Sequence, residues 1–227
     1  MEPISFFRTL TTRFAVPEQV QRGFTLVEMI VVLGIIVGIT AIVMNGQSTY
    51  NQSLILSDTA YTVAFSVRQA QSLGLSSRAA GGISDAGYGV HFDLGSSYTI
   101  FADTARGLPA PVNAWCPLGT AGTPEAKPGN CRYDSAGDTV VQSYSFSRGF
   151  RIVTLCATSG GSRSCNHQGL DVVFMRPETR AILTDSNGSP YSCVEVHVRA
   201  PTGNATRIVR VSQLGEVSVG GVEHICP

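Results

Sequence analysis

An apolar segment near the start of the chain constrains the fold more than any other feature. Residues 24–44 read FTLVEMIVVLGIIVGITAIVM and contain no lysine or arginine. A helix of this length rises about 30 Å, which is enough to cross the hydrocarbon core of a bilayer. The segment is longer than the apolar core of a secretory signal peptide, it follows a long basic leader, and no Ala-x-Ala site closes it. We therefore predict a membrane-spanning helix rather than an ordinary signal peptide.

One carboxylate, that of Glu28, lies inside this apolar segment. A carboxylate in a membrane-spanning helix costs free energy unless it has a partner, so Glu28 is a candidate functional residue. The alternative is a glutamate whose side chain reaches the membrane interface and has no specific partner. Arg8, Arg13 and Arg22 make the leader positively charged, which favours a cytoplasmic position for the leader.

The boundary between the leader and the apolar segment reads RGFTLVEM at residues 22–29. This sequence resembles the cleavage and methylation signature of type IV prepilins and of the related pseudopilins. The resemblance implies cleavage between Gly23 and Phe24, N-methylation of Phe24, and contact of Glu28 with the N-terminal amine of a neighbouring subunit during assembly. It also implies three partners: other pilin or pseudopilin subunits, a prepilin peptidase that is also the methyltransferase, and the inner or cytoplasmic membrane. We therefore expect a single-pass membrane protein with an extracytoplasmic C-terminal domain, which later joins a cell-surface or periplasmic filament.

A second helical pattern follows the apolar segment. Asn45-Gly46 is expected to bend or locally melt the helix, and the pattern then resumes and fades near Leu75. Apolar residues recur at spacings of three and four, which predicts a helix face that packs on a sheet. That face consists of Leu56, Ala60, Val63, Val67 and Ala70, and Tyr61 and Phe65 are expected to widen it.

Beyond Gly82 the apolar period changes from helical to two, which indicates β-strands. The predicted strands are 88–92, 98–102, 139–146, 150–156, 170–175, 181–184, 193–199, 205–212 and 216–219. One long helix followed by antiparallel strands predicts an α+β fold, with a half-transmembrane helix packed on an antiparallel β-sheet domain in the manner of pilins. We assign residues 1–23 to the leader, 24–44 to the transmembrane and assembly helix, 45–78 to its amphipathic second half and 79–227 to the β-rich domain.

Three stretches of the β-rich domain resemble one smaller group within the prepilin and pseudopilin family. They are the hairpin that ends at Phe101-Ala-Asp103, the VVFMRPE run at 172–178 and the closing segment 208–217. All three are similar to the GspH/FimT-like group of minor pilins and minor pseudopilins. This similarity implies a minor structural subunit of a type IV pilus or of a type II secretion pseudopilus. The Pro- and Gly-rich loop 104–137 and its cysteines depart from the pattern of the group.

The six cysteines all lie in the C-terminal half of the chain. They are Cys116, Cys131, Cys156, Cys165, Cys193 and Cys226. None forms the Cys-x-x-Cys pair of zinc ribbons and thioredoxin-type sites, and an even number beyond a membrane segment indicates disulfides in an oxidising compartment. The sequence does not select among the possible pairings. Closure of local loops favours Cys116–Cys131, Cys156–Cys165 and Cys193–Cys226, with a metal site as the alternative.

The remaining polar residues form no catalytic constellation. The four histidines, His91, His167, His197 and His224, are scattered, and there is no nucleophile elbow, phosphate-binding glycine loop or His-Glu-x-x-His motif. The run Asp185-Ser-Asn187-Gly188 resembles the start of a calcium loop but lacks the distant glutamate of an EF-hand, so we predict a turn. We expect no enzymatic activity, no cofactor and no metal.

Nucleic-acid binding or adhesion at a filament tip is the alternative function, because some FimT-type minor pilins resemble DNA receptors used in uptake. The chain has 16 basic and 16 acidic residues, so it has no global attraction for DNA, and binding needs several arginines on one surface. Arg199, Arg207 and Arg210 are the candidates, with Arg148 and Arg151 as further candidates. Solvated strand edges are the competing explanation for these arginines, and loop 104–137 is the candidate for adhesion.

Overall fold

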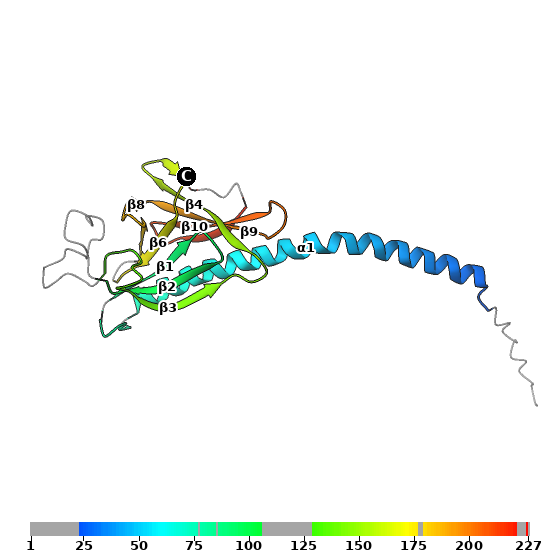
Figure 1. Cartoon of the computed structure of the whole chain (residues 1–227), viewed down its shortest axis with the longest axis horizontal. Coiled ribbons are helices and arrows are strands. Elements are labelled where there is room, and N and C mark those ends of the chain that lie inside the picture. The colour runs from blue at the N-terminus through cyan, green and yellow to red at the C-terminus, as the bar shows by residue number, and fades with distance from the viewer. Residues whose placement is uncertain are drawn as a thin grey trace, which may run out of the picture. The chain divides into compact units, whose positions relative to one another are not determined.

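The computed structural model describes residues 23–76, 78–84, 86–105, 129–176, 179–221 and 226, and at 45–49 it describes the backbone alone. Within these residues a single helix, α1 (Leu26–Leu75), precedes eleven strands (Figure 1). The predicted α+β class is therefore confirmed. The chain divides into two compact units between Gln47 and Ser48, and each unit is described by itself.

Helix α1 is continuous through Asn45-Gly46, so the predicted local melting there is wrong. A glycine in a helix interior costs only about 1 kcal/mol relative to alanine. Long runs of good hydrogen-bonded turns on both sides outweigh that cost, because helix propagation is cooperative.

The strands form two antiparallel sheets. The first sheet has the order β3-β2-β1-β6-β7-β8 and the second has the order β11-β10-β9-β4-β5. The bounds in the first sheet are β1 Gly87–Asp93, β2 Ser97–Asp103, β3 Thr139–Ser145, β6 Gly169–Phe174, β7 Ala181–Asp185 and β8 Pro190–Tyr191. The bounds in the second sheet are β4 Arg151–Ser159, β5 Ser162–Ser164, β9 Cys193–Arg199, β10 Thr206–Ser212 and β11 Val217–Gly220.

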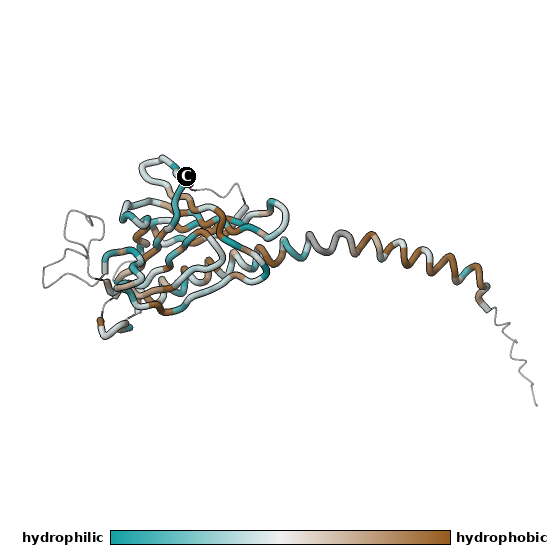
Figure 2. The backbone as a smooth tube through the Cα atoms, in the orientation of Figure 1, coloured by the Kyte–Doolittle hydropathy of each residue, from teal (hydrophilic) through white to brown (hydrophobic). Residues whose placement is uncertain are grey.

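The second half of α1 shares one hydrophobic core with both sheets. The predicted helix face is buried, because all five of its members are at most 2% exposed. They are Leu56, Ala60, Val63, Val67 and Ala70. From the sheets, alternate residues of β9 and β10 meet them, including Val194, Val196 and Val209. Figure 2 shows that hydrophobic residues are concentrated along the strands of the unit and hydrophilic residues at its turns.

Hydrogen bonds fix α1 against both sheets. The hydroxyls of Ser66 and Tyr98 of β2 lie 2.9 Å apart, and the Arg68 guanidinium donates to the carbonyl of Val217 of β11 at 3.2 Å. Near the end of the helix, a Cβ placed on Gly74 would lie 2.4 Å from the carbonyl oxygen of Phe174 of β6. The helix therefore approaches this strand too closely for any side chain at position 74.

All the predicted strands occur in the structure, with shifts of a few residues at their ends. The two strands that the sequence did not indicate are β5 and β8, which are three and two residues long. Strands this short contain too few residues to show an alternation of apolar and polar side chains. The predicted hairpin at 88–102 is the β1–β2 pair, in which Val90 lies opposite Ile100.

Candidate functional site

The first turn of α1 begins directly beyond the predicted cleavage position. Residues 23–25 are non-helical, and the amide of Glu28 donates to the side-chain oxygen of Thr25 at 3.2 Å, while the amide of Met29 donates to the Thr25 carbonyl. Thr25 is therefore the N-cap of α1 and Glu28 is the third helical residue, the Thr-x-x-Glu spacing of a capping box. A carboxylate in the first turn also interacts favourably with the helix dipole. The capping role of Thr25 was missed in the sequence, although the Thr-x-x-Glu spacing signals it.

The first half of α1 is apolar on all sides and exposed on all sides. Residues Leu26–Met44 form the one span, among the described residues, that is long and apolar enough to cross a membrane, and none of it is buried. The exposed fractions of its large side chains range from 45% for Val32 to 76% for Ile42. A helix without a polar face requires an apolar environment from outside its own chain.

Comparison with protein-family models matched residues 19–44 to the prokaryotic N-terminal methylation motif. This is the N-terminal segment of a type IV pilin-like protein. The motif implies processing by a prepilin peptidase and assembly with other pilins, and the apolar span that follows it is long enough to serve as a single membrane anchor. Comparisons with curated proteins and with solved structures found no match.

The second half of α1 in this pilin-like protein has two apolar faces rather than one. Tyr61 and Phe65, expected to widen the buried face, are 61% and 69% exposed, so that expectation is wrong. They follow Tyr50 and Leu54, at 66% and 52% exposed, and successive members of the set are four, seven and four residues apart. These four residues lie on one side of the helix, opposite the buried face. We call them the outward stripe.

The three arginines predicted to contact DNA do not share one surface. Along β10, Val209 and Val211 point into the core, so Arg207 points to the same side, and its guanidinium donates to Ser57 of α1 at 3.2 Å. Arg210 points to the other face of the sheet and lies 3.5 Å from a carboxylate oxygen of Glu216. Arg199 lies at the end of β9, opposite Arg151 of β4.

Two disulfides join described residues of the β-rich unit. Cys156 and Cys165 close the β4–β5 hairpin, nine residues apart, and Cys193 bonds Cys226 across 33 residues. Cys131 is also disulfide-bonded. Cys116 lies outside the described residues, as do His224 and most of loop 104–137, so the pairing of Cys116 with Cys131 stays a prediction.

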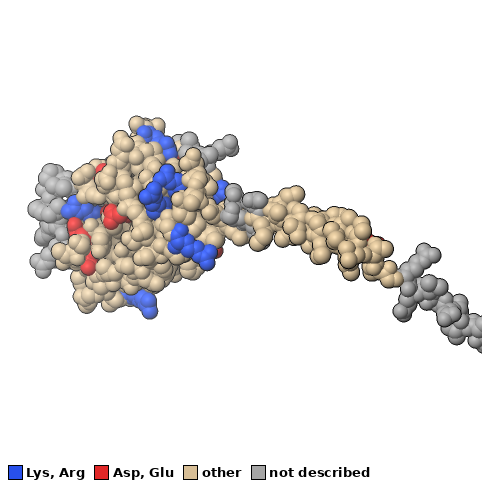
Figure 3. Space-filling model, turned by 45° about the vertical axis from the view of Figure 1, so that its right-hand side comes forward, with Lys and Arg blue, Asp and Glu red and all other residues tan. Residues whose placement is uncertain are grey.

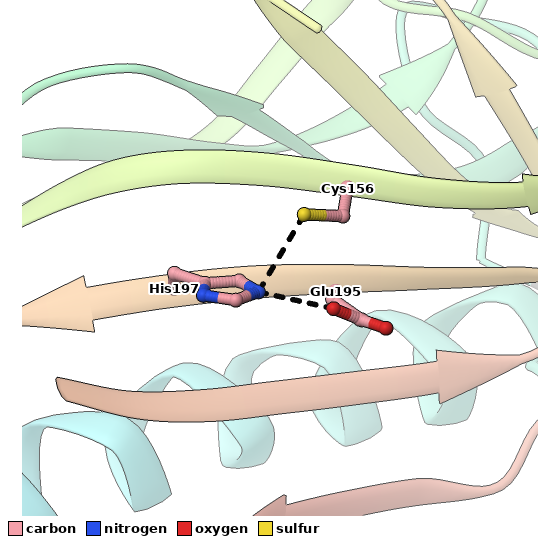
Figure 4. A group of neighbouring side chains, drawn as sticks. All are labelled: Cys156, Glu195 and His197. Atoms are coloured by element: carbon pink, nitrogen blue, oxygen red, sulfur yellow. Dashed lines mark hydrogen bonds and ion pairs between the residues drawn. The ribbon is translucent and has the colours of Figure 1, made fainter. Parts of the chain in front are cut away.

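A charged cluster lies between the two disulfides on the outer face of the second sheet. Cys156, Glu195 and His197 point toward one another (Figure 4). His197 Nε2 lies 3.0 Å from Glu195 Oε2 and 3.7 Å from Cys156 Sγ, a spacing that would suit a metal ion. Because the sulfur of Cys156 is in a disulfide, it has no thiolate to offer a metal. Arg163 of β5 also binds the carboxylate of Glu195. Its Nε lies 3.1 Å from Oε1 and 3.2 Å from Oε2.

Glu195 is fully buried and ionised. Burial by itself raises the pKa of a carboxyl group, but hydrogen bonds from His197, Arg163 and the amide of Cys226 outweigh burial and lower the pKa of Glu195 to about 2. The amide of Cys226 donates to Oε1 at 2.7 Å. The cluster thus ties the C-terminal segment to the sheet, by one disulfide and one charged hydrogen bond. No local sequence pattern indicates this cluster, because Arg163 lies 32 residues before Glu195 and Cys226 lies 31 residues after it.

A second buried cluster holds the segment 129–138 against the first sheet. The carboxylate of Asp103 accepts the amides of Asn130 at 2.9 Å and Cys131 at 2.7 Å. Gly129 adopts a φ of 116°, and a Cβ there would lie 2.5 Å from an oxygen of Asp103, so the contact requires glycine. Burial raises the pKa of Asp103 well above its usual value.

His91 of β1 completes this cluster. Its Nδ1 lies 2.7 Å from Asp171 of β6 and its Nε2 lies 3.0 Å from Asp93, while the ring of Tyr133 packs over it at 4.7 Å. Burial lowers the pKa of His91, but its contacts with Asp171 and Asp93 outweigh burial and raise it. The arrangement is that of a paired histidine in a strand, and it anchors the loop segment through Tyr133.

The predicted turn at Asp185-Ser-Asn187-Gly188 is present. One carboxylate oxygen of Asp185 accepts the amides of Asn187 and Ser189, each at 2.9 Å, and the other accepts the hydroxyl of Tyr191 at 3.1 Å. Burial, followed by the charge of Asp185, raises the pKa of Tyr191 to about 12. The oxygens of Asp185 therefore organise the turn itself.

Proposed function

We propose that this chain is a minor pilin-like subunit, of the GspH/FimT-like group, in a type IV pilus or a type II secretion pseudopilus. A prepilin peptidase cleaves it between Gly23 and Phe24 and methylates the new amine of Phe24. Before assembly the chain crosses the membrane once, with its β-rich domain outside the cytoplasm. It then enters the filament through α1.

The observation that carries this proposal is the place of Glu28. It is the one charged residue in the span Leu26–Met44, and it lies in the first turn of α1, in the half of the helix that no other described residue covers. The amine of Phe24 from a neighbouring subunit supplies the opposite charge that a carboxylate in an apolar medium requires. Pairing of these two groups would set the axial position of each incoming subunit.

The outward stripe supports the same proposal. Isolated exposed apolar residues are ordinary, but a contiguous row of large ones marks an interaction surface. Tyr50, Leu54, Tyr61 and Phe65 form such a row on a helix whose other face is already buried. In a filament, the helices of neighbouring subunits would cover this row.

Processing can be tested by mass spectrometry of the protein extracted from membranes that contain the peptidase. The expected product lacks residues 1–23 and carries one methyl group on Phe24. A protein that keeps its leader, in cells that process another prepilin normally, would contradict the proposal.

Assembly can be tested separately by substituting Glu28. Glu28→Ala should be cleaved normally and yet be lost from sheared filaments by at least about tenfold, since an unpaired amine in an apolar core costs more than 1.4 kcal/mol. Ile36→Val, which changes the same helix without changing charge, is the control and should be incorporated normally. Equal incorporation of Glu28→Ala and wild type would exclude the assigned role.

The DNA-binding alternative is not proposed as the function. Its candidates Arg199, Arg207 and Arg210 lie on two faces of the second sheet, and Arg210 has an acidic partner in Glu216. Retardation of a DNA duplex by the purified protein at low salt, with a steep loss of binding as salt rises, would restore this alternative.

A further inference from the structure

Three arginines gather at one end of the β-rich unit. Arg151 and Arg199 are paired residues of β4 and β9, with their Cα atoms in register. Arg148 belongs to the turn between β3 and β4, and the adjacent Gly149 lies close to Pro201 of the β9–β10 turn, because a Cβ placed on Gly149 would lie 3.0 Å from the Cβ of Pro201. Figure 1 shows these two turns together at the same end of the strands. We call Arg148, Arg151 and Arg199 the rim arginines.

The rim arginines lie at the end of the unit that the chain tethers to its membrane span. Next to Pro201, the hydroxyl of Thr202 donates to the side-chain oxygen of Gln52 on α1 at 2.6 Å. Gln52 is eight residues beyond Met44, the last residue of the span. Eight helical residues rise about 12 Å, and even a fully extended chain of eight residues reaches only about 28 Å. Covalent connection alone therefore holds this rim near the membrane surface.

The rim carries excess positive charge. Arg148 and Arg151 are exposed and Arg199 is half-buried, and among the described residues no ion pair neutralises any of the three. The acidic residues nearest in the adjoining elements include Asp58 of α1, Asp93 of β1 and Glu195 of β9. Asp93 is paired with His91 at 3.0 Å, and Glu195 is paired with Arg163. Figure 3 shows basic side chains at several places on the face in view, with acidic side chains among them.

The backbone at Arg148 is unfavourable for an arginine. Arg148 and Gly149 have φ values of 57° and 79°, and the amide of Phe150 donates to the carbonyl of Ser147 at 3.3 Å. A turn with two consecutive left-handed residues favours Asn-Gly, Asp-Gly or Gly-Gly. Folding alone would therefore favour asparagine or glycine at position 148, and the arginine is best explained by its charge.

We propose that the rim arginines bind the anionic phospholipid headgroups of the membrane that holds the chain's own span. Each arginine close to an anionic bilayer strengthens binding about fivefold. Because the tether confines the rim to the membrane surface, even weak contacts are populated at high effective concentration. A nucleic acid carries similar phosphates but has no such tether. The unassembled subunit would thus rest with its rim on the headgroups. The inference depends on the membrane anchor and not on filament assembly.

The test uses the full chain in nanodiscs and measures hydrogen exchange of the peptides 146–151 and 199–206. In discs containing phosphatidylglycerol these peptides should exchange severalfold more slowly than in discs of phosphatidylcholine alone. Raising the salt to about 1 M, where the Debye length is about 3 Å, should remove the difference. Equal exchange in the two lipids at low salt would overturn the proposal.

Two variants of the rim arginines and one matched control distinguish charge at the rim from positive charge elsewhere on the unit. Arg151→Gln/Arg199→Gln should lose most of the lipid-dependent protection, and Arg148→Asn, which suits the turn, should reduce it without loss of stability. Arg78→Gln/Arg180→Gln removes two exposed arginines near the other end of α1, where Gln71 donates to the carbonyl of Thr179 at 3.3 Å. This control should keep the full protection. An equal loss in the control would overturn the proposal, as would protection by an added DNA duplex but not by phosphatidylglycerol.

Discussion

The two halves of α1 belong to one continuous helix but have opposite relations to the rest of the chain. In the first half, no residue of the span Leu26–Met44 is buried. In the second half, Ala60, Val63 and Val67 are completely buried against the sheets. The difference follows from sequence period, since the first half is apolar on every side and the second has a buried face of spacing three and four. The second half of the helix therefore packs against apolar residues of its own chain. The first half needs an apolar environment that the described chain does not supply.

The largest expected effect on stability comes from substituting one of two leucines in the same helix. Leu56 is 2% exposed and Leu54 is 52% exposed. Leu56→Ala should lower the free energy of unfolding of the β-rich unit by about 2–5 kcal/mol, because it removes core contacts and leaves a cavity. Leu54→Ala should change it by less than about 0.5 kcal/mol. Thermal unfolding of the detergent-solubilised chain, followed by near-ultraviolet circular dichroism, measures both, and equal effects would break the comparison.

Disulfides should affect the two regions differently, because the six cysteines all follow α1. Replacing Cys193 and Cys226 by serine should destabilise the β-rich unit by about 2–4 kcal/mol. The same change at Cys156 and Cys165 should cost less, since the closed loop spans 9 rather than 33 residues. Hydrogen exchange within the membrane span should not change in either variant. A slower or faster exchange there would show that the two regions are coupled.

Acid should weaken the β-rich unit through Glu195. The pKa of this carboxyl is about 2 in the folded protein, below its ordinary value of about 4.3. Its stabilising contribution, about 2–3 kcal/mol, is therefore complete above the ordinary pKa and is lost as the pH falls toward 2. The difference in unfolding free energy between wild type and Glu195→Gln should shrink over that range. A difference that does not vary with pH would contradict the assigned ion pairs.

Only a small effect on stability is expected from a double substitution in the outward stripe. Tyr61→Ser/Phe65→Ser should change the free energy of unfolding by less than about 1 kcal/mol, since both side chains are exposed. Incorporation into filaments should nevertheless fall, because the stripe would no longer bury apolar surface between subunits. Ser53→Ala, an exposed site of α1 outside the stripe, is the control. Filaments that accept the double variant as readily as this control would show that the stripe is not an interface.

The parts of the fold that follow from periodic apolar residues were predictable. Strand β9 was predicted at 193–199 with its observed bounds, and the buried face of α1 was predicted from spacing alone. The side of the helix on which Tyr61 and Phe65 lie was not predictable by residue type, since large aromatic side chains serve cores and interfaces equally. The division of the strands into two sheets also has no local signal, because it depends on crossovers between strands distant in sequence.

The candidate sites also fall into two groups, those carried by a contiguous sequence and those assembled only by folding. Gly23, Phe24 and Glu28 were identified because a contiguous sequence carries them, and their processing and assembly roles stay predictions. The ion pair of Arg163 with Glu195 and the amide contacts of Asp103 join residues about thirty positions apart, so that only folding brings them together. The candidate DNA contacts failed to converge because β-strand alternation placed Arg207 on the opposite face from Arg210.

The N-cap at Thr25 has a consequence for maturation. Cleavage between Gly23 and Phe24 would remove no atom that takes part in the first turn of α1, because the helix is closed by Thr25 and Glu28, which both stay with the mature chain. Maturation would therefore be conformationally silent in this helix. Its sole local effect would be to create a new chain end, one residue before the cap, in a subunit whose anchor was already fully formed.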